Sequence, residues 1–226
     1  MERLDGARFL VAGASGGLGA PIARRLAAGG AAITRVARDA GRLEALDVVG
    51  ERRSFDLRTP ESCSAAVEAA AGPDGRLDGV VNAVGVVAFG PVEELAPDVM
   101  EELFLTNTFV PMMLARAAVP RLAEGGVLIN ISGVVAEKSF PGMAAYAASK
   151  AAVRAFDEGL AAEVRRRKIR VIDARPPHTE TGLADRPIAG TAPRFPTGLE
   201  PDAVAERIVR AIIDGERELP SDAFTP

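Results

Sequence analysis

The sequence predicts an α/β fold in which a doubly wound parallel sheet is flanked by helices on both faces. Three observations support this prediction: short apolar runs recur along the chain, segments with helical spacing separate them, and a glycine-rich turn follows the first run. Strands that are covered on both faces are apolar throughout, and right-handed crossovers between them favour a doubly wound order. The 226 residues suit a single domain, 1–226, built around one sheet.

Six short runs are the expected strands of this sheet: Arg8–Ala12, Ala31–Ala37, Glu51–Phe55, Gly79–Asn82, Gly126–Ser132 and Ile169–Ala174. The segments between them carry helical spacing. In one of them Val153, Phe156, Leu160 and Val164 fall three or four residues apart and therefore share one helical face.

The stretch Pro176–Pro201 differs from the rest of the chain because it holds six prolines and three glycines and has little periodicity. We expect a long irregular segment there. In an open α/β sheet ligands bind beyond the carboxyl ends of the strands, so the segment either forms a lid over a ligand or is an ordinary surface loop.

Composition excludes several classes of function. The formal net charge is -4 and basic stretches are interleaved with acidic residues, so we expect no nucleic-acid partner. Cys63 and His178 are the only residues of their types, which predicts no disulfide and no metal site. No apolar run approaches the roughly 20 residues of a bilayer span and no signal peptide is recognised at the start, so we expect a cytoplasmic protein with no membrane partner.

A glycine-rich turn, Gly13-Ala14-Ser15-Gly16-Gly17-Leu18-Gly19, lies between the first strand and a helical segment. Glycine has no Cβ, so the backbone can turn tightly there and approach a pyrophosphate, with the helix N-terminal N–H groups aimed at its charge. The alternative is a tight turn that binds no ligand.

The spacing GxxxGxG resembles that of the short-chain dehydrogenase/reductases, whose pattern begins TGxxxGxG, with Ala12 in place of the threonine. The resemblance continues in order to about Ala211 and implies a Rossmann-type fold with a nicotinamide dinucleotide cofactor. Later segments of the chain resemble the family's NNAG and PGxxxT motifs, with Pro177 in place of the glycine of PGxxxT. The implied cofactor contacts are Gly13, Ser15, Gly16, Gly17, Leu18, Gly19, Asp56, Leu57, Asn82, Ala83, Pro176, Thr179 and Thr181.

Tyr146 and Lys150 match the family's YxxxK motif, and Tyr146 is the only tyrosine. Residues four apart share a helical face, and a nearby ammonium favours phenolate, so we expect a lowered pKa for Tyr146 and a role as general acid and base. The resemblance implies that both residues also contact the cofactor, with Lys150 holding a ribose, and that Asn107 supports a water in a proton relay.

The family's substrate-orienting serine would lie thirteen residues before the tyrosine, where this chain has Gly133. Three explanations remain open: Ser132 reaches in and replaces the missing hydroxyl, water or another group polarises the carbonyl, or catalysis has been lost. We prefer Ser132 as the donor, although neighbouring side chains on a strand point to opposite faces.

The second expected strand ends Arg35-Val36-Ala37-Arg38, with no carboxylate at Ala37 to hold a ribose 2′-hydroxyl. Arg38 can instead meet a 2′-phosphate, which favours NADP(H) over NAD(H). The alternative is a solvated arginine at a strand end.

These motifs together indicate a reductase that transfers hydride between NADP(H) and a small-molecule ketone or alcohol. The alternative is a dinucleotide-binding regulatory or scaffold protein that keeps the fold without turnover. By analogy with relatives we expect a homodimer or homotetramer, paired through the helices that hold Asn107 and Tyr146. Met112, Met113 and Phe156 either supply that contact or pack internally. His178 lies either near the nicotinamide or on a loop.

Overall fold

The computed structural model describes residues 4–224 and confirms the expected fold class. Its sheet has six parallel strands in the order β3-β2-β1-β4-β5-β6. The strands are β1 (Arg8–Ala12), β2 (Ala32–Ala37), β3 (Glu51–Ser54), β4 (Leu77–Asn82), β5 (Leu122–Ile131) and β6 (Arg170–Ala174). The chain reverses its direction of travel across the sheet between β1 and β4, which is where ligands bind in doubly wound sheets.

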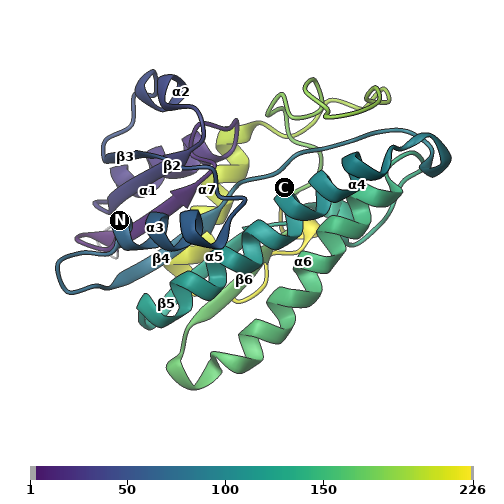
Figure 1. Ribbon diagram of the computed structural model, residues 1–226. Helices are drawn as coiled ribbons and strands as arrows, with labels where there is room; N and C mark the ends of the chain where they lie inside the picture. Colours follow the sequence, from purple (N-terminus) through teal and green to yellow (C-terminus); the bar gives the residue numbers. More distant parts are fainter. Residues whose placement is uncertain (1–3, 225–226) are drawn as a thin grey trace.

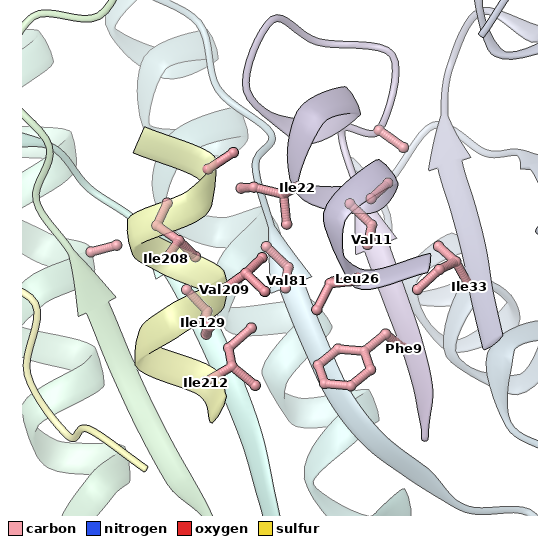
Figure 2. Close-up of a cluster of buried hydrophobic side chains, with 14 of the residues drawn as sticks. Phe9, Val11, Ile22, Leu26, Ile33, Val81, Ile129, Ile208, Val209 and Ile212 are labelled. Atoms are coloured by element: carbon pink, nitrogen blue, oxygen red, sulfur yellow. The ribbon is translucent and has the colours of Figure 1, made fainter. Parts of the chain in front are cut away.

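Helices cover both faces of this sheet (Figure 1). They are α1 (Gly19–Ala28), α2 (Ala40–Glu44), α3 (Pro60–Ala70), α4 (Pro97–Phe104), α5 (Val110–Ala118), α6 (Ala144–Glu163) and α7 (Pro201–Asp214). Apolar residues of α1 and α7 pack on one face, as Figure 2 shows for Ile22, Leu26, Ile208, Val209 and Ile212. Residues of α3, α5 and α6 form a second core on the other face.

Five of the six strands differ in their bounds from the expected ranges, and β5 differs most. β5 begins at Leu122, four residues before the expected start, because the chain is already paired with β4 through Leu77 and Leu122. β3 lies at the edge of the sheet and all four of its residues are exposed. Its charged side chains are typical of an edge strand that must not pair with another chain.

The helical stretch Pro97–Arg121 joins α4 and α5 through one π-helical turn, Leu105–Phe109. Its 25 residues are long and apolar enough to cross a membrane by length and composition alone, with a mean hydropathy of 1.2. Half of an 18-residue apolar part of this stretch is buried inside the protein. Core helices of folded proteins pass the same test, so the stretch is weak evidence for a membrane span.

Residues 176–200 contain no helix or extended strand, as the sequence predicts. Isolated bridges hold the segment, pairing Ala189 with Ala88 and Thr179 with Leu199. Leu183, Ala184 and Phe195 pack against a small apolar cluster around Tyr146. The segment, yellow-green in Figure 1, therefore covers the neighbourhood of Tyr146 as a lid would.

A row of buried polar side chains crosses the face of the sheet that α6 covers. Asn82 of β4 is paired with Asn130 of β5, and the Asn82 Nδ2 donates to Asn130 Oδ1 at 3.0 Å. Asn130 Nδ2 in turn donates to Asp157 Oδ1 of α6 at 2.7 Å. Asp157 is 2% exposed, and burial raises its pKa well above the usual value.

We expect the parent to lose stability as pH rises and the Asp157→Asn variant to lack this loss. A carboxyl whose pKa is raised in the folded state stabilises the fold fully only below its unfolded pKa, and this contribution is lost as pH rises through the folded value. Asparagine keeps an acceptor for Asn130, so the variant should unfold within about 1 kcal/mol of the parent near pH 5 and be the more stable protein near pH 8. Urea denaturation at several pH values measures this difference.

Glu163→Gln is the matched control, because Glu163 is exposed on the same helix. This control should follow the parent at every pH. An Asp157→Asn protein whose stability falls with pH as steeply as that of the parent would show that Asp157 is ionised in the fold.

Candidate active site

The glycine turn lies at the carboxyl end of β1, next to the loop that follows β4. A Cβ on Gly13 would lie 2.7 Å from the carbonyl carbon of Ala83, and one on Gly17 would lie 2.4 Å from the carbonyl oxygen of Thr181. Gly13 also has φ +75°, a conformation that favours glycine. These glycines therefore let three segments meet closely: the turn, the loop after β4 and the start of residues 176–200.

The start of α1 fits a bound phosphate group. Its N-cap residue is Leu18, which has no side chain that can cap the helix, and its first turn contains no acidic residue. The positive end of the helix dipole is therefore uncompensated by side chains. A Cβ on Gly16 would meet only the oxygen of Gly13, at 3.1 Å, so the outer side of this turn is open.

Basic residues surround the place expected for the adenosine end of the cofactor. Arg38 is exposed after β2, and its carbonyl oxygen accepts a hydrogen bond from Ser54 Oγ at 2.8 Å. Arg42 Nη2 reaches the carbonyl oxygen of Ser15 in the glycine turn at 3.0 Å. Sequence reasoning missed Arg42, although its position four residues after Arg38 is a signal that could have found it.

Two expected adenine contacts are engaged within the protein. Asp56 forms an ion pair with Arg58, with 2.6 Å between Oδ2 and Nη2, and this hydrogen bond lowers the pKa of Asp56. The Leu57 side chain lies in the core, which leaves only its backbone for a ligand.

Asn82 and Ala83, expected beside the cofactor, lie where the chain leaves β4. Asn82 is 3% exposed, and its side chain bonds Asn130 and the backbone N–H of Val84. Asn82 therefore orders the loop from inside the sheet and offers no free side-chain group to a ligand. Ala83 N donates to Ala12 O at 2.9 Å, which places the loop directly beside the glycine turn.

Tyr146 and Lys150 lie one turn apart on α6 and are both buried. The phenol of Tyr146 lies among apolar side chains that include Val87, Phe89 and Met143. Burial raises the pKa of Tyr146 to about 12. The expected lowering of this pKa is therefore wrong for the protein alone.

The physical reason lies in the position of the Lys150 ammonium. Its Nζ donates to the carbonyl oxygen of Ile131 at 2.8 Å, and burial lowers the pKa of Lys150 to about 8. Desolvation is thus the stronger effect on both groups. It leaves Tyr146 protonated at neutral pH.

Asn107 lies in the π-helical turn and uses its whole amide to clamp the loop after β4. Its Oδ1 accepts from Val86 N and its Nδ2 donates to Val86 O, both at 2.9 Å. Nδ2 also donates to Ser149 Oγ of α6 at 3.0 Å. A Cβ on Gly85 would lie 3.3 Å from both Asn107 Oδ1 and Lys150 Nζ, so the two side chains converge on this loop.

Ser132 does not point to the place expected from the sequence. It is 1% exposed, and its Oγ donates to Asp173 Oδ1 on β6. The expectation that this hydroxyl replaces the missing donor is therefore corrected. The physical reason is that a serine hydroxyl has one proton to donate, and that of Ser132 is already donated to Asp173.

Gly133 adopts φ 83° and ψ 167°, a conformation that is essentially restricted to glycine. A Cβ there would have room, because its nearest contact would be Pro176 O at 3.7 Å. The position thus rejects a serine through its backbone conformation and not through lack of space.

Of the residues after β6 that the resemblance implies as cofactor contacts, some lie at the site and others do not. Thr181 packs on Gly17, and the carbonyl oxygen of Pro176 accepts from Val134 N at 3.0 Å. Thr179 Oγ1 instead donates to Pro177 O at 2.9 Å.

His178 makes contacts within residues 176–200 and helps to hold this segment in place. Its ring stacks on Phe195 with a centroid distance of 4.7 Å, and its Nε2 lies 3.5 Å from Glu180 Oε1. These contacts favour the interpretation of His178 as a loop residue over a role at the nicotinamide.

Comparisons with known proteins agree with this geometry. Residues 8–189 match the family described as short chain dehydrogenase. An uncharacterized oxidoreductase from Methylorubrum extorquens is 34% identical over 223 residues, covering 91% of this chain and 90% of that protein. A D-threitol dehydrogenase from Mycolicibacterium smegmatis is 34% identical over 225 residues, covering 92% of this chain and 86% of that one.

A solved structure from Burkholderia cenocepacia, titled a short chain dehydrogenase in complex with NADP, superposes with a TM-score of 0.84. It is 30% identical, and the match covers 98% of both chains. The family match spans most of the sequence, and the sheet order and the glycine turn agree with it. The chain therefore belongs to the short-chain dehydrogenase family and is an NAD(P)-dependent oxidoreductase.

Proposed function

We propose that the protein reduces a ketone with NADPH, with Tyr146 as the proton donor. The observation that carries this proposal is the buried phenol of Tyr146, one helical turn from Lys150 on α6. The cofactor, when bound, would supply hydride to the carbonyl carbon. The glycine turn and the start of α1 would hold its pyrophosphate, and Lys150 its ribose.

Reduction of a carbonyl requires a proton for the oxygen that becomes a hydroxyl. A phenol with a pKa near 12 carries this proton at neutral pH, so Tyr146 is in the protonation state of a general acid. Its transfer to the developing alkoxide leaves a buried phenolate. The ammonium of Lys150, one helical turn away, would stabilise that negative charge.

Preference for NADPH is supported by Arg38 and Arg42 near the glycine turn and by the absence of a carboxylate at Ala37. Guanidinium groups bind phosphate through charge-assisted hydrogen bonds. The Burkholderia neighbour, solved in complex with NADP, is consistent with the same choice.

The surroundings of Tyr146 favour a substrate with apolar substituents. The side chains that residues 176–200 turn toward Tyr146 are apolar, among them Leu183, Ala189 and Phe195, whereas Asp185 and Arg186 are exposed. An uncharged ketone can enter such a site without leaving polar groups unpaired.

We further propose that the whole chain acts as one domain in the cytoplasm, as a homodimer or homotetramer. Phe109, beside Asn107, is 52% exposed, and Met112, Met113 and Phe156 are partly exposed. An apolar surface of this kind is typical of a protein contact.

Gly133 supports a second candidate, a member of the family that binds the dinucleotide but does not reduce ketones, because the backbone there rejects the family's serine. A panel of substrates separates the two candidates. With NADPH we expect oxidation of the cofactor by apolar ketones and diketones and little by polyhydroxylated ketones of equal size. Absorbance of NADPH measures it, and tight binding with no turnover of any member would favour the second candidate.

Arg38→Ala should weaken NADPH binding about tenfold or more, because a hydrogen bond to a charged group contributes about 1.5–3 kcal/mol. NADH lacks the 2′-phosphate, so its affinity should stay close to that of the parent. Calorimetric titration of both cofactors measures the change. Arg166→Ala, an exposed arginine on the turn after α6, is the control. Equal NADPH affinity in Arg38→Ala and the control would refute the assignment.

Tyr146→Phe should lower kcat by about 10²–10⁴-fold, the usual contribution of a positioned general acid. The phenyl ring still fills the apolar cluster, so stability and NADPH affinity should change little. Steady-state kinetics with one ketone, together with cofactor titration, tests this prediction. Undiminished turnover in the variant would exclude Tyr146 as the proton donor.

A further inference from the structure

The carboxyl ends of β5 and β6 hold buried charged side chains that the reaction proposed above does not use. The Asp173 side chain, on β6, is 9% exposed, and that of Arg175, just after β6, is 10% exposed. Asp173 Oδ2 is buried without a hydrogen-bond partner among the described residues. Charged groups are rarely buried this deeply unless another charge compensates them.

Sheet register places Asp173 on the same face as Lys150. Asp173 is paired with Asn130, whose side chain contacts α6 through Asp157. Paired residues on neighbouring strands point to the same face, so Asp173 also faces α6. Lys150 arrives from α6 and donates to the carbonyl of Ile131, the residue after Asn130. The ammonium therefore reaches β5 on the same face of the sheet, and near the same end, as the Asp173 carboxyl on β6, and the charge of Asp173 acts on it.

Other contacts fix Asp173 without neutralising it. Ser132 Oγ donates to its Oδ1. Arg175 Nε lies 3.8 Å from Asp173 Oδ2 but only 2.8 Å from Glu137 Oε1, so Arg175 is paired mainly with Glu137. Arg175 therefore counters the charge of Asp173 only in part, and Lys150 and Asp173 also act on each other.

We propose that Asp173 is a positioning residue whose carboxylate, held by Ser132, keeps the buried ammonium of Lys150 charged. The inference rests on the proposed function, because the charge of Lys150 affects turnover only if Tyr146 donates the proton. In this arrangement Ser132 holds Asp173 in place and does not donate to the substrate carbonyl.

The charges that face this group act in the required directions. Burial lowers the pKa of Lys150 to about 8, and Asp173 is the charge that opposes this effect. Burial raises the pKa of Asp173, while the Ser132 hydrogen bond and the positive charges of Arg175, Lys150 and Arg154 lower it. Asp157, the other carboxyl on this face, favours its protonated form. Asp173 is therefore the principal carboxylate near Lys150.

Asp173→Asn removes this negative charge and keeps the size of the side chain. An ammonium that loses a neighbouring carboxylate loses its proton more readily, so the pKa of Lys150 should fall by about one unit. The alkaline limb of the kcat/KM profile should move to lower pH by the same amount, because Lys150 then becomes neutral earlier.

The pKa of Lys150 can be measured without any turnover. The chain has three lysines, Lys138, Lys150 and Lys168, so NMR of protein labelled at the lysine side chains gives three resonances. Lys150→Met identifies the resonance of Lys150. In Asp173→Asn its titration should shift to lower pH while those of Lys138 and Lys168 stay in place.

Glu137→Gln is the matched control, because it removes a nearby carboxylate that pairs with Arg175 and not with Lys150. Its Lys150 titration should stay close to that of the parent. If Asp173→Asn does not fold, Ser132→Ala takes its place, since loss of that hydrogen bond favours protonated Asp173 and should lower the pKa of Lys150 by a smaller amount.

The two measurements separate this inference from the proposed function. An unchanged Lys150 titration in Asp173→Asn, or in Ser132→Ala where the first does not fold, would overturn the role of Asp173 even in an active enzyme. If the Lys150 titration shifts in Asp173→Asn but the parent reduces no ketone, the proposed reaction is overturned and the electrostatic role of Asp173 stands. A loss of kcat/KM in Ser132→Ala by about 10²–10³-fold at all pH values would show that Ser132 donates to the substrate carbonyl and would overturn the inference.

Discussion

The register between β4 and β5 is the constraint on which the rest of the site depends. It pairs Asn82 with Asn130, and the next strand pair places Asp173 in the same row. Side chains alternate between the faces of a strand, so a slip by one residue would turn this row toward α1 and α7 and into the larger apolar core. The apolar alternation of the strands thus also fixes where the polar groups lie.

Each member of the row orders a different part of the active site. Asn82 holds the backbone of Val84 at the start of the loop after β4, and Asn107 clamps the same loop at Val86. Asn130 ties the sheet to α6, the helix that carries Tyr146 and Lys150. A few buried amides therefore link the loop after β4 to the helix that carries Tyr146. Buried polar networks of this kind specify geometry more than they add stability, and in this one Asp157 Oδ2 and Asp173 Oδ2 have no hydrogen-bond partner among the described residues.

Features encoded by local sequence could be predicted, whereas those set by tertiary surroundings could not. The strands, the glycine turn and the spacing of Tyr146 and Lys150 follow from short patterns, and the structure has them where expected. The pKa of Tyr146 depends on its burial among side chains from several distant segments, including Phe89 and residues 176–200, so the motif alone gave the wrong direction. The role of Asp173 was equally hidden, because an aspartate within a strand pattern does not reveal its partners.

The conformation of Gly133 and the orientation of Ser132 have a common consequence for the chemistry. A non-glycine residue at φ 83° would store about 1–3 kcal/mol of strain, so the backbone itself excludes the hydroxyl that relatives place there. Ser132, one residue earlier, already donates to Asp173. A donor aimed at a developing oxyanion usually contributes about 10²–10³ in rate, and the side chains at 132 and 133 do not supply it in this arrangement. In the reaction proposed above, Tyr146 would act without a second side-chain donor from these positions, which favours carbonyls that are already electron-poor. Diketones satisfy this requirement, because each carbonyl withdraws electrons from the other.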